Sequence, residues 1–383
     1  MILLLEVVFW VCLVSIVWTH AGYPLFMAAV ARMRPRPVAK ADILPTVSFL
    51  IPAYNEQAVI ESKLENTLAL DYPRELLEIL VTSDASSDQT HEIVRRYAGR
   101  GVGLLVCPRG GKMPALDRAV RQTTGEIVCM GDANVMWDAD SVRRMVRPYA
   151  DAGVGMVTGR VELVNPNNGT NQEGLYWRYE MWLRRNESAV HSETASNGAI
   201  HSIRRSLYRE LHPADDHDIS FPYHVVQQGF RAVYEPEAHA VENMTTDIED
   251  EFGRKSRFLE HCWLAIFKGS MWKLWRFPPL YAVAIVSHRF LRYLTGLLHV
   301  LLLVVSVALA AEAGGIYTVA LAVQLAGLGL ALISIAAGGR VPGISILHYY
   351  LLITWATFVS LLRYLRRGVP ATWDAAAGTR TVG

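Results

Sequence analysis

The chain has 383 residues, of which 51% are hydrophobic and 19% are charged, and its formal net charge is +1. This near-neutral charge argues against the extended basic surface of a nucleic-acid-binding protein, and the length allows one large or two modest domains. The four cysteines are scattered without a CxxC pair, which indicates reduced thiols and neither a disulfide framework nor a metal site.

Four long apolar runs stand near the two ends of the chain. Residues 7–31, 293–311, 313–339 and 341–362 contain no Asp, Glu, Lys or Arg, and a membrane-spanning helix needs about 20 apolar residues. We therefore expect a multi-pass protein of the plasma membrane, with an N-terminal transmembrane helix at 1–31 and C-terminal transmembrane helices within 291–366. The first run lacks the basic start of a cleaved signal peptide, so an uncleaved anchor is expected.

The charges that flank these runs predict an orientation but leave one conflict. The linker at 32–44 carries Arg32, Arg34, Arg36 and Lys40, which places the following domain in the cytoplasm. Three C-terminal spans would then leave the tail, residues 367–383, outside. However, Arg363, Arg366 and Arg367 at the end of the last apolar run favour a cytoplasmic tail. Either one run is interfacial or re-entrant, or the charge rule fails here.

Residues 45–250 are predicted to form an α/β domain. Strands are expected at 46–52, 76–82, 104–107 and 126–130, alternating with helices at 56–70, 88–98, 114–123 and 140–150. This order predicts a parallel sheet with helices on both faces, and ligands bind such sheets at the carboxyl ends of the strands. Later elements are a strand at 154–164, a helix at 175–190, a strand at 199–203, an acidic loop at 211–220 and a strand at 232–236. Basic and aromatic residues predict amphipathic interfacial helices at 251–290.

Polar motifs follow the first two strands. Pro52, Tyr54 and Glu56 lie at the end of the first strand, and Asp84 lies at the end of the second. The Asp84 carboxylate could accept hydrogen bonds from a base or a ribose. Taken alone, each motif is also compatible with a strand end, a helix cap or a solvated turn.

A lysine and a pair of oxygen ligands follow the next two strands. Lys112 comes after Gly110 and Gly111, whose backbone permits close approach to an anion. Asp132 and Asn134 point the same way if the backbone is extended, so their oxygens could share one divalent cation, Mg²⁺ or Mn²⁺. A cation beside a lysine suits a diphosphate, although helix capping would also explain the acid and the amide.

Two further clusters suggest roles in chemistry. Asp215, Asp216 and Asp218 stand close together, and neighbouring carboxylates raise one another's pKa, which favours a general base. The alternative is a solvated acidic loop. Arg254 and Arg257 lie one helical turn apart and could clamp a diphosphate or contact anionic lipid headgroups.

Together these motifs resemble glycosyltransferase family 2, the inverting group that includes the membrane synthases of cellulose, chitin and hyaluronan. The resemblance covers roughly residues 45–258 and extends more loosely into the membrane helices. It is carried by the order of the following landmarks: Pro52-Ala53-Tyr54-Asn55-Glu56, Asp84, Gly110-Gly111-Lys112, Asp132-Ala133-Asn134, Asn197-Gly198-Ala199-Ile200, Arg204-Arg205, Asp215-Asp216, Gly229-Phe230-Arg231 and Tyr234-Glu235-Pro236.

The resemblance implies a fold and a set of roles. The fold would be GT-A, a Rossmann-like mixed sheet with helices on both faces. A nucleotide sugar would contact the following residues: Pro52, Tyr54, Glu56, Asp84, Lys112, Asp132, Arg254 and Arg257. Asp132 and Asn134 would form the metal site, Asp216 would be the catalytic base with Asp218 as a second candidate, and Asp215 and Phe258 would lie on the acceptor side.

One family motif departs from its usual form. The QxxRW motif reads Arg254-Lys255-Ser256-Arg257-Phe258, so both the Gln and the Trp are missing. The Trp stacks on the acceptor sugar in processive synthases, which leaves processivity in doubt. Because few polar residues interrupt the C-terminal runs, we expect the membrane helices to anchor the enzyme or support a homo-oligomer.

The predicted function is metal-dependent, inverting transfer of a sugar from a nucleotide diphosphate, with uridine as the expected base, to a glycan or lipid-linked acceptor in exopolysaccharide or envelope synthesis. The alternatives are a polyprenyl-phosphate sugar synthase and a non-catalytic nucleotide-sugar-binding membrane protein. A transporter is disfavoured because the C-terminal runs lack intramembrane charge.

Overall fold

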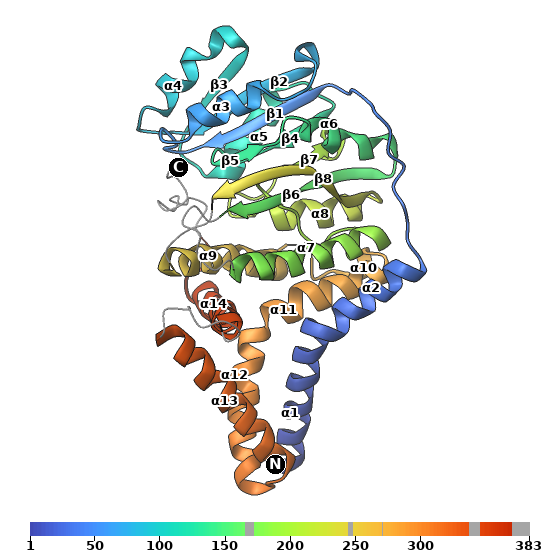
Figure 1. Cartoon of the computed structure of the whole chain (residues 1–383), viewed down its shortest axis with the longest axis vertical. Helices are drawn as coiled ribbons and strands as arrows, with labels where there is room; N and C mark the ends of the chain where they lie inside the picture. Colours follow the sequence, from blue (N-terminus) through green and yellow to red (C-terminus); the bar gives the residue numbers. More distant parts are fainter. Residues whose placement is uncertain (165–171, 244–247, 270, 337–344, 370–383) are drawn as a thin grey trace.

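The computed structural model describes residues 1–164, 172–243, 248–269, 271–336 and 345–369. Figure 1 shows three tiers along the long axis of the molecule. A sheet with its helices forms one end, a tier of helices lies below it, and long helices near the two ends of the chain form the other end. The first tier is an α/β domain, as predicted.

The described residues form one eight-stranded mixed sheet, in the order β3-β2-β1-β4-β7-β6-β8-β5. β1 to β4 are mutually parallel, β7 is antiparallel to β4 and β6, β8 is parallel to β6, and β5 is antiparallel to β8. The strands are β1 Val47–Ala53, β2 Leu77–Asp84, β3 Val102–Cys107, β4 Ile127–Met130, β5 Val135–Trp137, β6 Val154–Val164, β7 His201–Arg204 and β8 Arg231–Asn243.

Helices cover both faces of this sheet because the side chains of β1 alternate between two apolar cores. Phe49 and Ile51 pack with α3 Ile60–Leu68, α4 Thr90–Arg96 and α6 Ser141–Val146. Leu50 points to the other face and packs with α5 Lys112–Gln122 and α8 His217–Gln227. With both faces covered, the ends of the strands are left for ligands.

The tier below the sheet consists of helices that join it to the apolar helices. It contains α2 Tyr23–Met33, α7 Gln172–Val190, α9 Ile248–Phe267, α10 Pro279–Ala284 and α11 Leu291–Tyr293 (Figure 1). The chain enters this tier from α1 Ile2–Val17 through a π-helical segment, Trp18–Gly22. A π-helical turn inserts an extra residue into the helical ladder, a recognised cause of a bend between two helices.

Four helices of the described part of the chain are long and apolar enough to cross a membrane: Ile2–Met33, Thr295–Glu312, Ile316–Ala336 and Ile346–Arg367. The last three correspond to α12 Thr295–Glu312, α13 Ile316–Ala336 and α14 Ser345–Arg367. They coincide with the four apolar runs of the sequence. α14 lies beside α9 (Figure 1), where Trp263 Nε1 donates to Ser360 Oγ at 3.1 Å.

The structure corrects three local predictions. The loop expected at 211–220 ends early, because Asp216 caps α8 and the helix begins at His217. Pro52 does not end β1, which continues to Ala53 with Pro52 paired to Thr82. The strand and helix order predicted a parallel sheet, whereas β7 and β5 run antiparallel to their neighbours, which agrees with the mixed sheet that the resemblance implies; the short strand β5 was not predicted.

Candidate active site

One cavity of about 290 Å³ at the carboxyl ends of β1, β2 and β4 brings most of the predicted site residues together. This is the edge at which ligands bind in such sheets. Its walls include Pro52, Tyr54, Glu56, Asp84, Lys112, Asp132, Asn134, Asp215, Asp216, Asp218, Arg257 and Phe258. Arg254 is the exception, because its side chain lies outside the described residues.

Asp84 organises the loop that precedes Lys112. Its carboxylate accepts hydrogen bonds from the backbone N–H groups of Gly110 at 2.7 Å and Gly111 at 3.0 Å, and from Arg109 Nη1 at 2.5 Å. Gly111 has φ of 100°, a conformation that favours glycine. The two glycine amides therefore bind a carboxylate of this chain, whereas we expected them to be available to a diphosphate.

The loop fixes an aromatic platform and a lysine. The Arg109 guanidinium lies 3.4 Å from the centre of the Tyr54 ring, an arrangement that holds the ring against the cavity. Lys112 Nζ donates to Asp132 Oδ1 at 2.6 Å. Burial acts to lower the pKa of Lys112, but the charges of Asp132 and Asp218 outweigh it and raise the pKa, so the ammonium stays charged.

A third oxygen donor accompanies the predicted cation ligands. Asn134 Nδ2 donates to Glu242 Oε1 at 3.3 Å, and both residues line the cavity together with Asp132. Glu242 belongs to β8, where it pairs with Val135 in the register of the sheet. Two carboxylates and an amide are the hard oxygen donors that Mg²⁺ and Mn²⁺ prefer, so this set fits a divalent cation.

The two candidate bases differ in their surroundings. The Asp216 carboxylate accepts the backbone N–H of Asp218 at 2.8 Å and so caps α8. Asp218 Oδ1 is buried and lies 3.0 Å from His217 Nε2. Burial, followed by the charge of Asp216, raises the pKa of Asp218 well above its usual range. Asp218 therefore has the properties of a general base, while Asp216 holds the helix that carries it.

Asp218 is held between a glycine and two histidines. A Cβ on Gly198 would lie 2.3 Å from Asp218 Oδ1, so a side chain here would displace the Asp218 carboxylate. The rings of His201 and His217 stack at 4.8 Å between centres, and burial, then the Lys112 charge, lowers the pKa of both. His217 Nε2 lies 3.0 Å from Asp218 Oδ1, whereas His201 Nε2 makes no hydrogen bond within the described residues. One ring nitrogen of each histidine and one oxygen of Asp218 lie within 4.8 Å of one another, a second set that could hold a cation.

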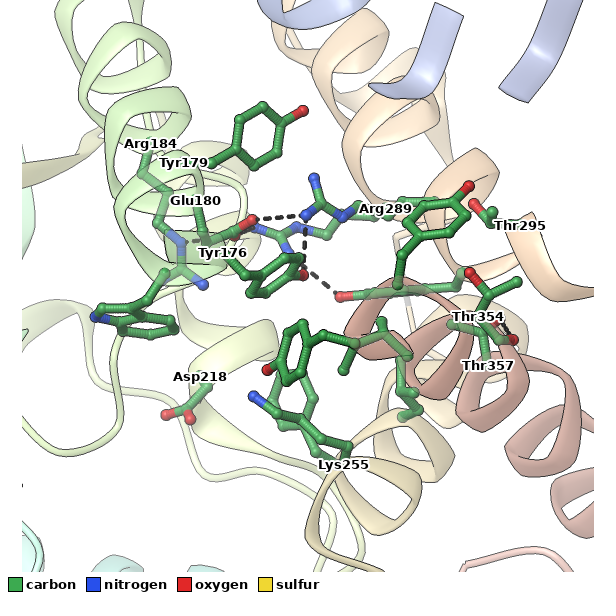
Figure 2. Close-up of a pocket in the computed structure, with 18 of the residues that line it drawn as sticks. Tyr176, Tyr179, Glu180, Arg184, Asp218, Lys255, Arg289, Thr295, Thr354 and Thr357 are labelled. Carbon is green, nitrogen blue, oxygen red and sulfur yellow. Dashed lines mark hydrogen bonds and ion pairs between the residues drawn. The ribbon is translucent and has the colours of Figure 1, made fainter. Parts of the chain in front are cut away.

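A larger cavity of about 900 Å³ adjoins the first (Figure 2). Asp132, Asp218, Glu242 and Phe258 line both cavities. Its other walls come from the π-helical segment Trp18–Gly22, a second π-helical segment at Ile285–Phe290, α7, α9, α11 and α14. They include Tyr176, Tyr179, Glu180, Arg184, Arg289 and Arg292. The candidate catalytic carboxylates thus stand at the junction of a small polar cavity and a larger one that reaches the apolar helices.

Three residues of the site were given no role from the sequence. Glu242 and His201 lie outside the predicted motifs, and His217 lies inside the acidic cluster but was not assigned a function. Position was the available signal, since Glu242 stands near the end of a strand and His217 stands between two aspartates. Neither signal separates a site residue from a solvated one.

Known proteins resemble this chain over the same region. Residues 48–211 match the family model described as Glycosyl transferase family 2. Beta-monoglucosyldiacylglycerol synthase of Trichormus variabilis is 29% identical over 230 residues, which cover 56% of this chain and 49% of that protein. Poly-beta-1,6-N-acetyl-D-glucosamine synthase of Staphylococcus aureus is 26% identical over 239 residues, covering 60% of this chain and 58% of that one. The chain thus spans about half the length of these curated relatives.

A solved structure resembles nearly the whole chain. The mannosyltransferase PcManGT from Pyrobaculum calidifontis, in complex with GDP-Man and Mn²⁺, superposes with a TM-score of 0.71 at 25% identity, covering 94% of this chain and 99% of that one. The likeness therefore includes the helices near both ends as well as the sheet, and it confirms the predicted fold class.

Proposed function

We propose that this chain, whose residues 48–211 match the family model described as Glycosyl transferase family 2, is a membrane-bound inverting enzyme that moves a sugar from a nucleotide-diphosphate donor to a glycan or lipid-linked acceptor. The observation that carries the proposal is the junction of the two cavities at Asp218 and Asp132. A donor in the small polar cavity and an acceptor in the larger one would meet at these carboxylates.

The small cavity suits a nucleoside diphosphate. The Tyr54 ring and the Asp84 carboxylate stand at adjacent strand ends, where a base and a ribose would contact them. Lys112 and Arg257 supply positive charge for the diphosphate, with Lys112 released from Asp132 when an anion or cation arrives. Asp132, Asn134 and Glu242 would hold the divalent cation, which when bound would neutralise charge on the departing diphosphate.

The proposed reaction is a single in-line displacement. An acceptor hydroxyl attacks the anomeric carbon as its proton passes to Asp218; the new C–O bond forms while the bond to the diphosphate breaks. One displacement inverts the anomeric centre. We place the base at Asp218 in preference to Asp216, because the Asp216 carboxylate is engaged in capping α8.

The test is a screen of radiolabelled uridine and guanosine diphosphate sugars, with Mg²⁺ or Mn²⁺, using membranes that contain the full chain. We expect product in the lipid or polymer fraction and, by NMR, an anomeric configuration opposite to that of the donor. A product of retained configuration would overturn the displacement mechanism. Failure of every donor to bind or turn over would overturn the proposed function.

A further inference from the structure

The larger cavity carries a ligand-binding feature that the proposed reaction does not use. Arg184, Arg289 and Arg292 converge on the single carboxylate of Glu180. Figure 2 shows Glu180 with Arg184 and Arg289 beside it. The distances from Glu180 oxygens are 3.0 Å to Arg184 Nε, 3.2 Å to Arg292 Nη2 and 4.0 Å to Arg289 Nη2. All four side chains are nearly fully buried. We refer to Arg184, Arg289 and Arg292 as the arginine cluster.

The arginine cluster is not neutralised by the carboxylates around it. Burial acts to raise the pKa of Glu180 and of Glu187, but contact with His288 and the arginines outweighs it and keeps both ionised. Burial raises the pKa of Glu193 to about 8, so this third carboxyl is protonated at neutral pH. Three guanidinium charges therefore face two ionised carboxylates, and any charge on His288 would add to the positive side. An unpaired buried charge is unfavourable unless a counter-ion is present.

Hydrogen-bond donors of the cluster also lack partners. Arg289 Nη2 and Arg292 Nη1 are buried and make no hydrogen bond within the described residues. Both side chains line the larger cavity. The remaining donors are engaged, for example Arg289 Nε with Thr194 Oγ1 at 2.8 Å and Arg292 Nη2 with the Tyr176 hydroxyl at 2.9 Å. Two guanidiniums with free donors form a fork that suits phosphate oxygens.

The far end of the cavity opens beside the apolar helices. Val17 of α1 and Ile346 and Tyr350 of α14 line it and are 55%, 50% and 37% exposed. Both α1 and α14 belong to helices apolar enough to cross a membrane. An occupant with an apolar tail could therefore enter from the bilayer while its polar head lies under the sheet domain.

We infer that this cavity binds an anionic lipid acceptor, a lipid whose head group is joined through a phosphate or diphosphate diester and carries a free hydroxyl. Its phosphate would contact Arg289 and Arg292, its chains would lie along α1 and α14, and its hydroxyl would reach Asp218. Figure 2 shows Asp218 across the cavity from Arg289, so the phosphate and the nucleophile are different groups of one molecule. The inference rests on the proposed function and names its acceptor class.

Transfer by the full chain in phosphatidylcholine nanodiscs tests this acceptor class, since phosphatidylcholine has no hydroxyl to glycosylate. The nanodiscs carry phosphatidylglycerol, a polyprenyl-diphosphate-linked sugar, diacylglycerol or polyprenyl monophosphate. We expect the wild-type protein to use one of the first two, which distinguishes a phospholipid from a lipid-linked sugar. Preference for neutral diacylglycerol, or for polyprenyl monophosphate as the nucleophile, would overturn the inference. This comparison uses only the wild-type protein, so it does not depend on the folding of any variant.

The arginine cluster is tested with Arg292→Gln, with Arg292→Lys as the conservative variant and the exposed Arg96→Gln as the matched control. Arg292→Gln should raise KM for the anionic lipid about 10-fold or more, with partial recovery in Arg292→Lys and no change in Arg96→Gln. Arg292→Gln should bind the donor with the same Kd as the wild type and should hydrolyse the donor at the same slow rate when lipid is absent. An unchanged KM would refute the phosphate contact, whereas loss of donor binding by the wild type would refute the proposed function itself.

Discussion

Replacement of Asp218 by Asn tests the assignment of the catalytic base, because Asn keeps the shape of the side chain and removes the proton acceptor. Loss of a general base lowers a rate by about 10²–10⁴, equivalent to about 3–5 kcal/mol of transition-state stabilisation. The donor does not need this proton acceptor in order to bind. We therefore expect kcat to fall by that factor while the Kd of the nucleotide sugar, measured by calorimetry, stays unchanged.

The raised pKa of Asp218 adds two pH signatures. Transfer by the wild type should increase as pH rises through that pKa, because the base acts in its ionised form. Since the folded state holds this proton more tightly than the unfolded state, Asp218 stabilises the fold at low pH and loses that contribution as pH rises through its folded pKa. Asp218→Asn should remove both slopes, the first in the rate and the second in the thermal unfolding midpoint.

The matched control is Asp216→Asn, because Asn is as good a helix cap as Asp. If Asp216 only caps α8, this variant should keep most of its activity and stability. Gly198→Ala gives an uncharged second perturbation, since its methyl group would displace the Asp218 carboxylate and should also lower kcat. Near-normal transfer by Asp218→Asn, together with collapse of Asp216→Asn, would refute the assignment and restore Asp216 as the base.

Three further outcomes are expected. Asp132→Asn should weaken Mn²⁺ binding about 10-fold or more, as measured by electron paramagnetic resonance, while His201→Gln should leave it unchanged. The reverse result would place the cation at His201, His217 and Asp218. Burial lowers the pKa of Lys63 to about 7, so between pH 7 and 10.5 the unfolded chain binds one more proton at this residue than the folded chain. The free energy of unfolding should therefore rise with pH in that range, by at most about 1.4 kcal/mol per pH unit. Lys63→Met should abolish this slope in unfolding titrations. In intact cells an impermeant maleimide should label Ala313→Cys but not Arg367→Cys, since we expect α14 to lie at the cytoplasmic interface; equal labelling would contradict this topology.

The topology prediction addresses a conflict that the sequence left open. Four apolar runs and a basic C-terminal end could not all obey the charge rule. In the structure, Arg363 and Arg367 lie 3.8 and 3.5 Å from Glu260 of α9, and α9 contacts the sheet domain through His261 Nδ1, which donates to the Ala214 carbonyl at 2.7 Å. The basic end of α14 is thus on the side of the sheet domain. The side on which the basic end of α14 lies could not be predicted from hydropathy, because hydropathy depends on the length and apolar content of a segment and not on its packing.

The strand-end motifs were predictable because local rules govern them. A strand that is buried on both faces reads as a continuous apolar run, and the polar residues after it must lie at the sheet edge. Asp84 ends one such strand and Asp132 follows another, while Lys112 follows the edge strand β3, so their convergence could be expected before their contacts were known. The hydrogen-bond partners of these residues could not be predicted from the sequence. In the structure the backbone N–H groups of Gly110 and Gly111 donate to Asp84.

The arginine cluster shows why the rest could not be predicted. Arg184 comes from α7, whereas Arg289 and Arg292 come from the turns before α12, about a hundred residues later. From the sequence, Arg184 lies in the helix predicted at 175–190, Arg289 lies in the predicted interfacial helices, and Arg292 lies at the start of the predicted C-terminal helices. Only the folded chain shows that the three share one carboxylate and line a cavity that begins at Asp218. Because this cluster is assembled from distant helices, no spacing in the sequence indicates it, so the proposed acceptor site depends on tertiary packing, whereas the proposed donor site depends on strand ends.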